Sequence, residues 1–317
     1  MRYVVFGAGA VGGVVGGLLS VAGCEVALIA RGSHLAAIRE NGLTVQTPYA
    51  SHLVKVDVAG DPSELGMRTG DVVLLGMKGN DTAAAVQALA RAADPATPVV
   101  CLQNGVANER TALRHFENVY GVCVMCPTTH LEPGIVRADC GPVPGILDTG
   151  RYPSGVDGTV EKITADLRTA GFYSEPQPDV MRWKYAKLLT NITNGVDSVL
   201  LRSSAERPGI LGAVRAEAMS ILDAVGIAYA SDEEDAERRG EVLQVRGVRG
   251  GGSSWQSLTR GTGSIETDFI NGEIVLLARE HGLDAPYNVN AQRWANRFAW
   301  EHRTPRSLEA ADWLATL

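Results

Sequence analysis

The first 23 residues constrain the fold of this chain more than any other stretch. The apolar run Met1–Phe6 leads directly into Gly-Ala-Gly-Ala-Val-Gly at positions 7–12, and an apolar segment continues to Gly23. A strand, a glycine turn and a helix start in direct succession are the context in which this pattern predicts dinucleotide binding. The alternative is a flexible loop before a core helix. The predicted phosphate-binding residues are Gly7, Ala8, Gly9, Ala10, Val11 and Gly12.

Each glycine has a physical role in such a loop. Gly7 would permit the tight turn, Gly9 would let the backbone approach a pyrophosphate, and Gly12 would let the helix lie close to the strand. The phosphates would face the helix N-terminus, where unpaired amides and the helix dipole favour anions.

The second apolar run, residues 24–30, ends at the position where such a fold contacts the adenosine ribose of the cofactor. NAD-binding sites place an acidic residue there, about 20 residues after the glycines, to bind the 2′-hydroxyl. This chain has Arg31 instead. A guanidinium suits a 2′-phosphate because it offers a fork of charged donors. The sequence therefore predicts NADP as the cofactor, and the alternative is that Arg31 is an ordinary surface arginine.

Length and charge limit the number of domains and the classes of partner that we expect. A chain of 317 residues exceeds the usual size of one domain, so we expect two domains. A net charge of −7 argues against nucleic acid or an anionic membrane as a general partner. The apolar run 11–22 contains four glycines and is too short to span a bilayer, so we interpret it as a buried helix. No targeting signal is recognisable, which makes the cytoplasm the expected location.

Cys123 and Cys126 have the spacing of half a zinc knuckle or of a redox pair. The sequence contains no second C-x-x-C or H-x-x-x-H to complete a metal site. Residues 119–126 also have the pattern of one continuous buried strand. We therefore expect core cysteines and no metal.

Apolar runs that predict strands recur at residues 54–56, 71–75, 98–102 and 119–126, with helix-compatible segments such as 82–93 between several of them. Alternating strands and helices predict an α/β fold with a Rossmann-type, doubly wound parallel sheet. Residues 134–148 predict antiparallel edge strands, and residues 159–170 predict a closing helix. Lys78 and the turn Gln103-Asn104-Gly105 follow two of the strands, where a ligand in the crevice would be reached.

Proline and polar residues at 174–179 mark the expected domain boundary. It separates an NADP-binding domain, residues 1–177, from an all-helical domain for substrate binding or dimerisation, residues 178–317. Helical periodicity in the second domain covers residues 181–200, 208–224, 233–245, 265–281 and 288–302. Ser264 is a candidate N-cap for the fourth of these helices.

One face of the predicted helix 181–200 is polar. Trp183, Lys187, Asn191 and Asn194 are spaced by four, four and three residues, which places them on one side of a helix. A lysine that faces a cofactor crevice can stabilise charge on a carbonyl oxygen and deliver a proton to it. The alternative is a solvated helix face on which the lysine extends to water.

Taken together, these motifs resemble the ketopantoate reductase family. The resemblance is carried, in order, by the glycine loop with Arg31, the Gln103-Asn104-Gly105 turn, Lys187 with Asn191, Ser253-Ser254, the block E-T-D-F-I-N-G at 266–272, A-R-E-H-G at 278–282, Pro286 and Asn288. It covers nearly the whole chain. The E-x-D-x-I-N-G block with the upstream lysine is more specific than the glycine motif.

The resemblance implies NADPH-dependent reduction of a small 2-oxo acid to a 2-hydroxy acid, with ketopantoate to pantoate as the leading reaction. The site would lie in a cleft between a Rossmann domain and a helical domain. A homodimer is possible, and the sequence leaves the oligomeric state open. Catalytic roles fall to Lys187 as proton donor, Asn104 as a holder of the nicotinamide and the lysine, and Glu266 as an orienting group. Lys78 would bind the cofactor, and Asn191, Asn194 and Ser254 would bind the substrate.

Departures from the family pattern leave the substrate open. Gly79-Asn80-Asp81 follows Lys78 in place of an early aromatic residue, and Asn194 comes one residue early and precedes Gly195-Val196-Asp197. Trp255 and Leu258 replace the usual residues around the paired serines. The alternatives are a related reductase acting on a different 2-oxo acid, and a non-catalytic NADP-binding sensor. Retention of Lys187, Asn104 and Glu266 together disfavours the sensor.

Overall fold

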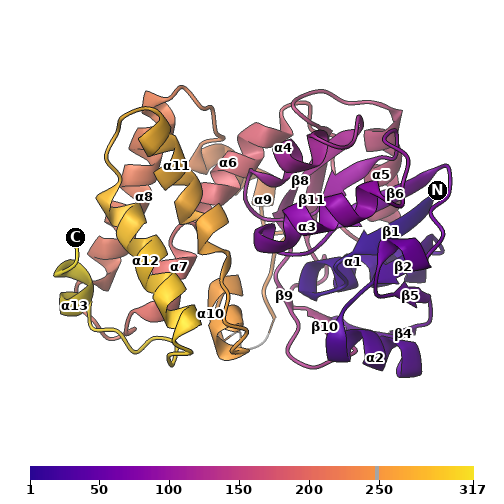
Figure 1. Cartoon of the computed structure of the whole chain (residues 1–317), viewed down its shortest axis with the longest axis horizontal. Coiled ribbons are helices and arrows are strands. Elements are labelled where there is room, and N and C mark those ends of the chain that lie inside the picture. Colours follow the sequence, from indigo (N-terminus) through magenta and orange to yellow (C-terminus); the bar gives the residue numbers. More distant parts are fainter. Residues whose placement is uncertain (247–249) are drawn as a thin grey trace. The chain divides into compact units, whose positions relative to one another are not determined.

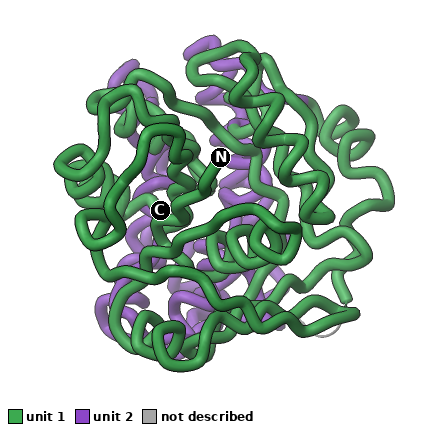
Figure 2. The backbone as a smooth tube through the Cα atoms, turned by 90° about the vertical axis from the view of Figure 1, so that its right-hand side faces the viewer, with its two compact units in different colours: residues 1–184, 231–247 green, residues 185–230, 248–317 purple. Residues whose placement is uncertain are grey.

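The computed structural model describes residues 1–246 and 250–317, and the described chain forms two compact units (Figure 2). Unit 1 comprises Met1–Lys184 and Ser231–Gly247, and unit 2 comprises Tyr185–Ala230 and Val248–Leu317. The chain leaves unit 1 inside helix α6 (Val180–Asn191) and later returns to it.

Within residues 1–246, the main sheet of unit 1 has seven strands, all parallel except one edge strand. Their order follows the doubly wound pattern, in which successive strands are added on one side of the first strand and then on its other side. Across the sheet they are β11 (Ile146–Arg151), β8 (Val119–Met125), β7 (Val99–Cys101), β6 (Asp71–Leu75), β1 (Arg2–Phe6), β2 (Glu25–Ile29) and β5 (Asp57–Ala59). The predicted Rossmann-type sheet is confirmed.

Helices cover both faces of this sheet, as Figure 1 shows. Val4 and Val5 point to opposite faces because successive side chains of a strand alternate. Val5 packs with the apolar residues of α1 and α5, whereas Val4 packs with those of α3 and α4. The helices are α1 (Ala10–Val21), α2 (Gly32–Asn41), η1 (Pro62–Glu64), α3 (Gly79–Ala90), α4 (Asn108–Leu113) and α5 (Gly158–Thr169).

A second, smaller sheet in the same residue range has four strands. Their order is β4 (Ser51–Val54), β3 (Leu43–Gln46), β10 (Ile135–Ala138) and β9 (Thr128–Thr129). The predicted strand at 54–56 is wrong, because β4 ends at Val54 and β5 begins at Asp57. Of the predicted edge strands, β11 does pair antiparallel with β8, but β10 pairs with β3 and β9 in the small sheet.

Helix α9 (Asp232–Arg239) belongs to unit 1 although the sequence assigns it to the second domain. Arg238 binds the buried carboxylate of Asp148 through two nitrogens, at 2.8 and 2.5 Å, and Glu234 accepts from Arg182. The predicted extension of this helix to residue 245 is wrong, because the helix ends at Arg239 and is followed by Gly240, whose φ is +45°.

In its described residues unit 2 is helical, as predicted. α8, α11 and α12 pack against one another (Figure 1). None of the helices in residues 1–246 and 250–317 has both the length and the apolarity needed to cross a membrane. The elements after α6 in this unit are α7 (Asn194–Val199), α8 (Arg207–Ala224), α10 (Ser253–Thr259), η2 (Glu266–Phe269), α11 (Asn271–Glu280), α12 (Pro286–Trp300) and α13 (Ala310–Leu314).

Candidate active site

The glycine loop lies where the strand order reverses, between β1 and its neighbour β6. Gly7 has a φ of +99°, and a Cβ at this position would lie 2.6 Å from the amide nitrogen of Met77. A Cβ on Gly12 would lie 2.2 Å from the carbonyl oxygen of Gly7. Both positions therefore require glycine, one for the turn and one for the close approach of α1. Ligands of doubly wound folds bind at such a reversal point.

Gly9, in contrast, faces open space. A Cβ on Gly9 would meet only the Nδ1 atom of His130, at 3.9 Å. Gly9 is the N-cap residue of α1, and no side chain caps the first amides of this helix, which come from Ala10, Val11 and Gly12. Because these amides and the helix dipole attract negative charge, the loop fits the pyrophosphate of a dinucleotide.

His34, which no sequence motif singled out, positions this loop. Its Nε2 atom donates to the Ala8 carbonyl oxygen at 2.7 Å, while its Nδ1 atom accepts from the Gly134 amide at 2.9 Å. Burial lowers the pKa of His34, and the hydrogen bond to Ala8 only partly opposes this. The imidazole is therefore neutral and connects the glycine loop to the turn before β10. The spacing of His34 from the glycines carries no signal, since its contacts depend on the fold.

Arg31 is the N-cap residue of α2, directly after β2. Its side chain is 72% exposed and forms an ion pair of 3.1 Å with Asp81, in the first turn of α3. The guanidinium is accessible to a ligand, but a 2′-phosphate would have to compete with the Asp81 carboxylate.

Lys78 and Asn104 lie at the same edge of the sheet as the glycine loop. Lys78 is the N-cap residue of α3 and follows β6. Asn104 lies in the turn after β7, where Gly105 has a φ of +80°. Because the carboxyl ends of parallel strands meet at one edge, the structure brings together the predicted cofactor residues of unit 1.

A chain of buried amides fixes the turn that carries Asn104. Gln103 donates to the Met77 carbonyl at 2.9 Å and to the Thr82 hydroxyl at 2.8 Å. The Thr82 hydroxyl donates to the side chain of Asn108, which in turn donates to the carbonyl of Asn104. The sequence identified the Gln103-Asn104 turn but not Thr82 or Asn108, because these two residues come from separate helices, α3 before the turn and α4 after it.

Two lysines three residues apart on α6 have different environments. Lys184 is buried and forms an ion pair of 2.7 Å with Glu109, and the two side chains are 2% and 0% exposed. Its ammonium also donates to the carbonyl oxygens of Gln103 and Val122, at 2.9 and 3.3 Å. Within the described residues, the Glu109 carboxylate has no further hydrogen-bond donor. Lys184 is therefore a structural residue of unit 1, whereas Lys187 is half-buried and belongs to unit 2.

The predicted helix 181–200 is interrupted. α6 ends at Asn191 and α7 begins at Asn194, so Asn194 does not continue the helix face of Lys187 and Asn191. The two asparagines still meet, because Asn194 donates to the side chain of Asn191 at 3.3 Å. The structure thus brings together two of the predicted substrate residues, one helical turn after Lys187.

Asn271, in the E-x-D-x-I-N-G block, supports this interruption. Its side-chain amide donates to the carbonyl of Ile192 at 2.9 Å and to the side chain of Asn288 at 3.0 Å, and it accepts from Thr267. The carbonyl of Ile192, left without a helical partner at the end of α6, is thereby satisfied. Asn271 and Asn288 are buried structural residues that hold the segment carrying Asn191 and Asn194.

Ser254 lies in the first turn of α10, which packs against α7. The backbone of Gly252 approaches Asn194 closely, since a Cβ on Gly252 would lie 3.3 Å from the Asn194 Oδ1 atom. Ser254 therefore lies two residues after the backbone that approaches Asn194, within unit 2.

Glu266 is the first residue of the short helix η2. Thr267, which follows it, lies beside the start of α7, because a Cβ on Gly195 would be 3.5 Å from the Thr267 hydroxyl. Asp268 accepts from Gln292 and Asn296 of α12, each at 2.7 Å, so it is tied to structure. The predicted N-cap role of Ser264 is wrong, because η2 starts after Ile265 and no side chain caps it.

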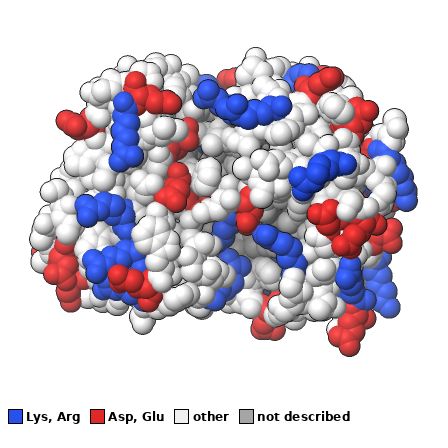
Figure 3. Space-filling model, viewed as in Figure 1, with Lys and Arg blue, Asp and Glu red and all other residues white. Residues whose placement is uncertain are grey.

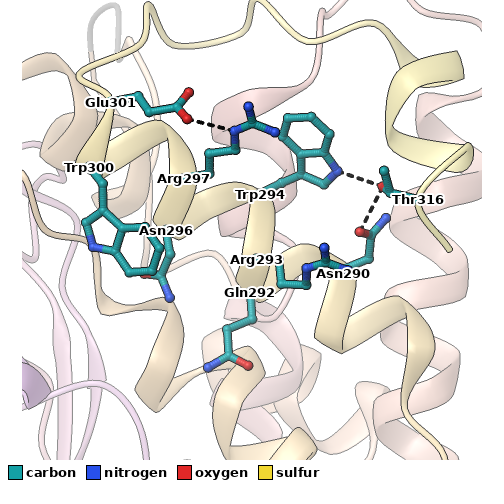
Figure 4. A pocket seen from close by; sticks show the side chains of 9 residues that line it. All are labelled: Asn290, Gln292, Arg293, Trp294, Asn296, Arg297, Trp300, Glu301 and Thr316. Carbon is teal, nitrogen blue, oxygen red and sulfur yellow. Dashed lines mark hydrogen bonds and ion pairs between the residues drawn. The ribbon is translucent and has the colours of Figure 1, made fainter.

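A pocket of about 510 Å³ on α12 contains none of the predicted site residues. Figure 4 shows its side chains, several of which bind one another: Trp294 donates to Thr316, Thr316 to Asn290, and Arg297 to Glu301. The face drawn in Figure 3 mixes positive and negative side chains without a continuous basic patch. The described residues also contain no group of three or more His, Cys, Asp or Glu suited to a metal, and Cys123 and Cys126 are buried.

Known proteins resemble this chain over nearly its whole length. Residues 3–151 match the family model for ketopantoate reductase PanE/ApbA, and residues 179–292 match the model for its C-terminal part. A 2-dehydropantoate 2-reductase of Halobacterium salinarum is 30% identical over 301 residues, which cover 90% of this chain and 95% of the relative.

Two solved structures have the same fold. A PanE/ApbA family ketopantoate reductase from Ralstonia eutropha JMP134 has a TM-score of 0.80 at 29% identity, covering 95% of this chain and 99% of that one. D-mandelate dehydrogenase, solved with NADH and anilino(oxo)acetate, has a TM-score of 0.81 at 21% identity and the same coverage. At that identity the second likeness concerns the fold alone.

Proposed function

The chain belongs to the ketopantoate reductase family, and from this premise we propose that it reduces a small 2-oxo acid to a 2-hydroxy acid with NADPH. Ketopantoate is the leading substrate. The observation that carries the proposal is that one chain holds both sets of residues that such a reaction needs. Unit 1 has an open glycine loop at the reversal of its sheet, and unit 2 has Lys187 one turn before the Asn191–Asn194 pair.

The residues of unit 1 would hold the cofactor. The amides of residues 10–12 would bind the pyrophosphate, Arg31 would bind the 2′-phosphate, and Lys78 and Asn104 would face the ligand from the ends of β6 and β7. Bound NADPH would supply a hydride to the carbonyl carbon of the substrate. His34 and the Gln103–Thr82–Asn108 hydrogen bonds would keep the two loops in position without moving on binding.

The residues of unit 2 would complete the reaction. Lys187 would donate a proton to the carbonyl oxygen as it becomes an alcohol oxygen, so the ketone gains one hydride and one proton. Asn191, Asn194 and Ser254 would hydrogen-bond the carboxylate or hydroxyl of the substrate, and Glu266 would orient the hydroxyl or the lysine. Positioned acids of this kind commonly contribute about 10²–10⁴-fold to the rate.

Cofactor preference gives a direct prediction. Arg31→Ala should weaken NADPH binding about ten- to a hundredfold, the effect of losing one charge-assisted contact, and leave NADH binding nearly unchanged. Asp81→Asn is the matched variant, because it removes the carboxylate that competes for Arg31 and should tighten NADPH binding. Titration calorimetry with both cofactors measures these effects. Equal affinity of the unaltered protein for NADPH and NADH would contradict the assignment.

The substrate class is tested by following NADPH absorbance against a panel of 2-oxo acids. The panel should contain ketopantoate and 2-oxo acids with smaller and aromatic side chains, because Trp255 and Gly195-Val196 change the expected pocket wall. Differences of one methylene in an apolar pocket are worth only about 1–3 kcal/mol, so another member of the panel can be preferred over ketopantoate. Binding of NADPH without turnover of any member would favour the non-catalytic sensor.

A further inference from the structure

Arg306 lies outside every motif of the sequence and yet makes several contacts within unit 2. It follows α12, its side chain is 14% exposed, and its φ is +59°. A left-handed backbone is costly for a residue other than glycine, and it persists where surrounding contacts hold it. The Arg306 side chain donates to the Gly250 carbonyl at 2.9 Å and to the Asp197 carboxylate at 3.1 Å. It therefore connects α7 to the segment that leads into α10.

The segment under Arg306 is packed against an indole. The Arg306 guanidinium lies 5.6 Å from the centre of the Trp255 ring. A Cβ on Gly250 would lie 2.4 Å from this ring, and a Cβ on Gly251 would lie 2.6 Å from it. The two glycines thus lie flat against Trp255, and the next residue, Gly252, reaches Asn194. Gly250 also accepts from Arg202, but at the longer distance of 3.3 Å.

Asp197 provides an internal comparison, because two arginines bind it. Arg207, the first residue of α8, forms an ion pair with the same carboxylate as Arg306. Burial raises the pKa of Asp197, but the hydrogen bonds from the two arginines lower this pKa by more, so the net shift is downward. Among the interactions of the described residues, the hydrogen bond to Gly250 and the contact with the Trp255 ring come from Arg306 of this pair. The two arginines share a structural partner and differ in their contact with the segment beside Asn194 and Ser254.

We propose that Arg306 is a positioning residue for the substrate: it holds residues 250–252 and Trp255 against α7, and so sets the places of Ser254 and Asn194. This rests on the proposed function. Trp255 is also one of the residues at which the chain departs from the usual family pattern around the paired serines. The shape of the substrate site beside Asn191 and Asn194 then depends on Arg306, which is distant in sequence from every predicted substrate residue.

Arg306→Ala and Arg207→Ala make the test pair. Arg306→Ala should raise KM for the best 2-oxo acid about tenfold, as expected for a lost charge-assisted contact, with kcat lowered much less and KM for NADPH unchanged. Arg207→Ala should leave all three parameters near those of the unaltered enzyme. Arg306→Lys, which can make one of the two contacts, should lie between. A loss confined to kcat, or an equal rise in KM with Arg207→Ala, would overturn the proposal.

A second measurement does not depend on turnover. Hydrogen exchange of the backbone amides of residues 250–258 should be faster in Arg306→Ala than in Arg207→Ala, because only the first variant releases the segment. If the enzyme reduces no 2-oxo acid but this difference is seen, the proposed function fails while the attachment of the segment stands. Unchanged exchange in Arg306→Ala would refute the attachment, and faster exchange with an unchanged KM would refute its role for the substrate.

Discussion

Lys187→Met is expected to lower kcat about 10²–10⁴-fold, the usual effect of removing a positioned acid. The side chain is half-buried on α6, one turn before Asn191, whereas the buried ion pair of this helix with Glu109 is formed by Lys184. The melting temperature and the affinity for NADPH should therefore stay close to those of the unaltered enzyme. Initial rates of NADPH consumption at saturating 2-oxo acid, with a binding titration, measure both parts of the expectation.

Two further variants separate proton donation from charge. Lys187→Arg keeps the positive charge, but a guanidinium does not release its proton near neutral pH, so this variant should be nearly as slow as Lys187→Met. Lys162→Met removes an exposed lysine of α5 and is expected to have no effect on kcat. High activity in Lys187→Arg would show that the charge alone matters and would contradict a proton donor at this position.

Judged from spacing alone, a variant of Lys184, three residues before Lys187, would be the natural control for the Lys187 variants. Its buried ion pair makes it unsuitable as a control. Lys184→Met should instead destabilise the protein by about 3–5 kcal/mol, because it leaves a charged Glu109 buried without a counter-charge. Glu109 is fully buried, and the Lys184 ammonium is its ion-pair partner at 2.7 Å. The midpoint of urea unfolding of the unliganded protein measures the loss.

The double variant Lys184→Met/Glu109→Leu tests the cause. Replacing both members of a buried pair by apolar residues of similar volume is often neutral, so the double variant should recover most of the lost stability. Lys162→Met serves again as the control, since its ion pair with Asp166 is half-exposed and should be worth less than about 1 kcal/mol. If Lys184→Met cost no more than Lys162→Met, the buried pair would not be the source of stability.

Local patterns in the sequence predict much of unit 1 correctly. The apolar runs and the glycines at 7–12 place a strand, a turn and a helix in succession. The positive φ of Gly7 and the close approach of Gly12 to the carbonyl of Gly7 are both local requirements. Lys78 and Asn104 follow buried strands, so their place at one edge of the sheet comes from the parallel topology alone. Lys187 and Asn191 share a helix face because four residues make about one turn.

Other features depend on contacts between distant segments, and no periodicity encodes them. Residues 231–247 join unit 1 because Arg238 binds Asp148, 90 positions earlier in the chain. α6 stops at Asn191, with the carbonyl of Ile192 satisfied by Asn271, which is 79 residues away. Lys184 and Lys187 are the same residue type on one helix, and only the position of Glu109 separates a structural lysine from a candidate catalytic one. The sequence by itself determined most of the strands and helices of unit 1 and predicted the edge of the sheet at which a ligand would bind, because apolar periodicity and glycine geometry act locally. The tertiary structure alone decided which polar groups are paired in the interior, because a buried charge or carbonyl must find its partner wherever the packed core brings one.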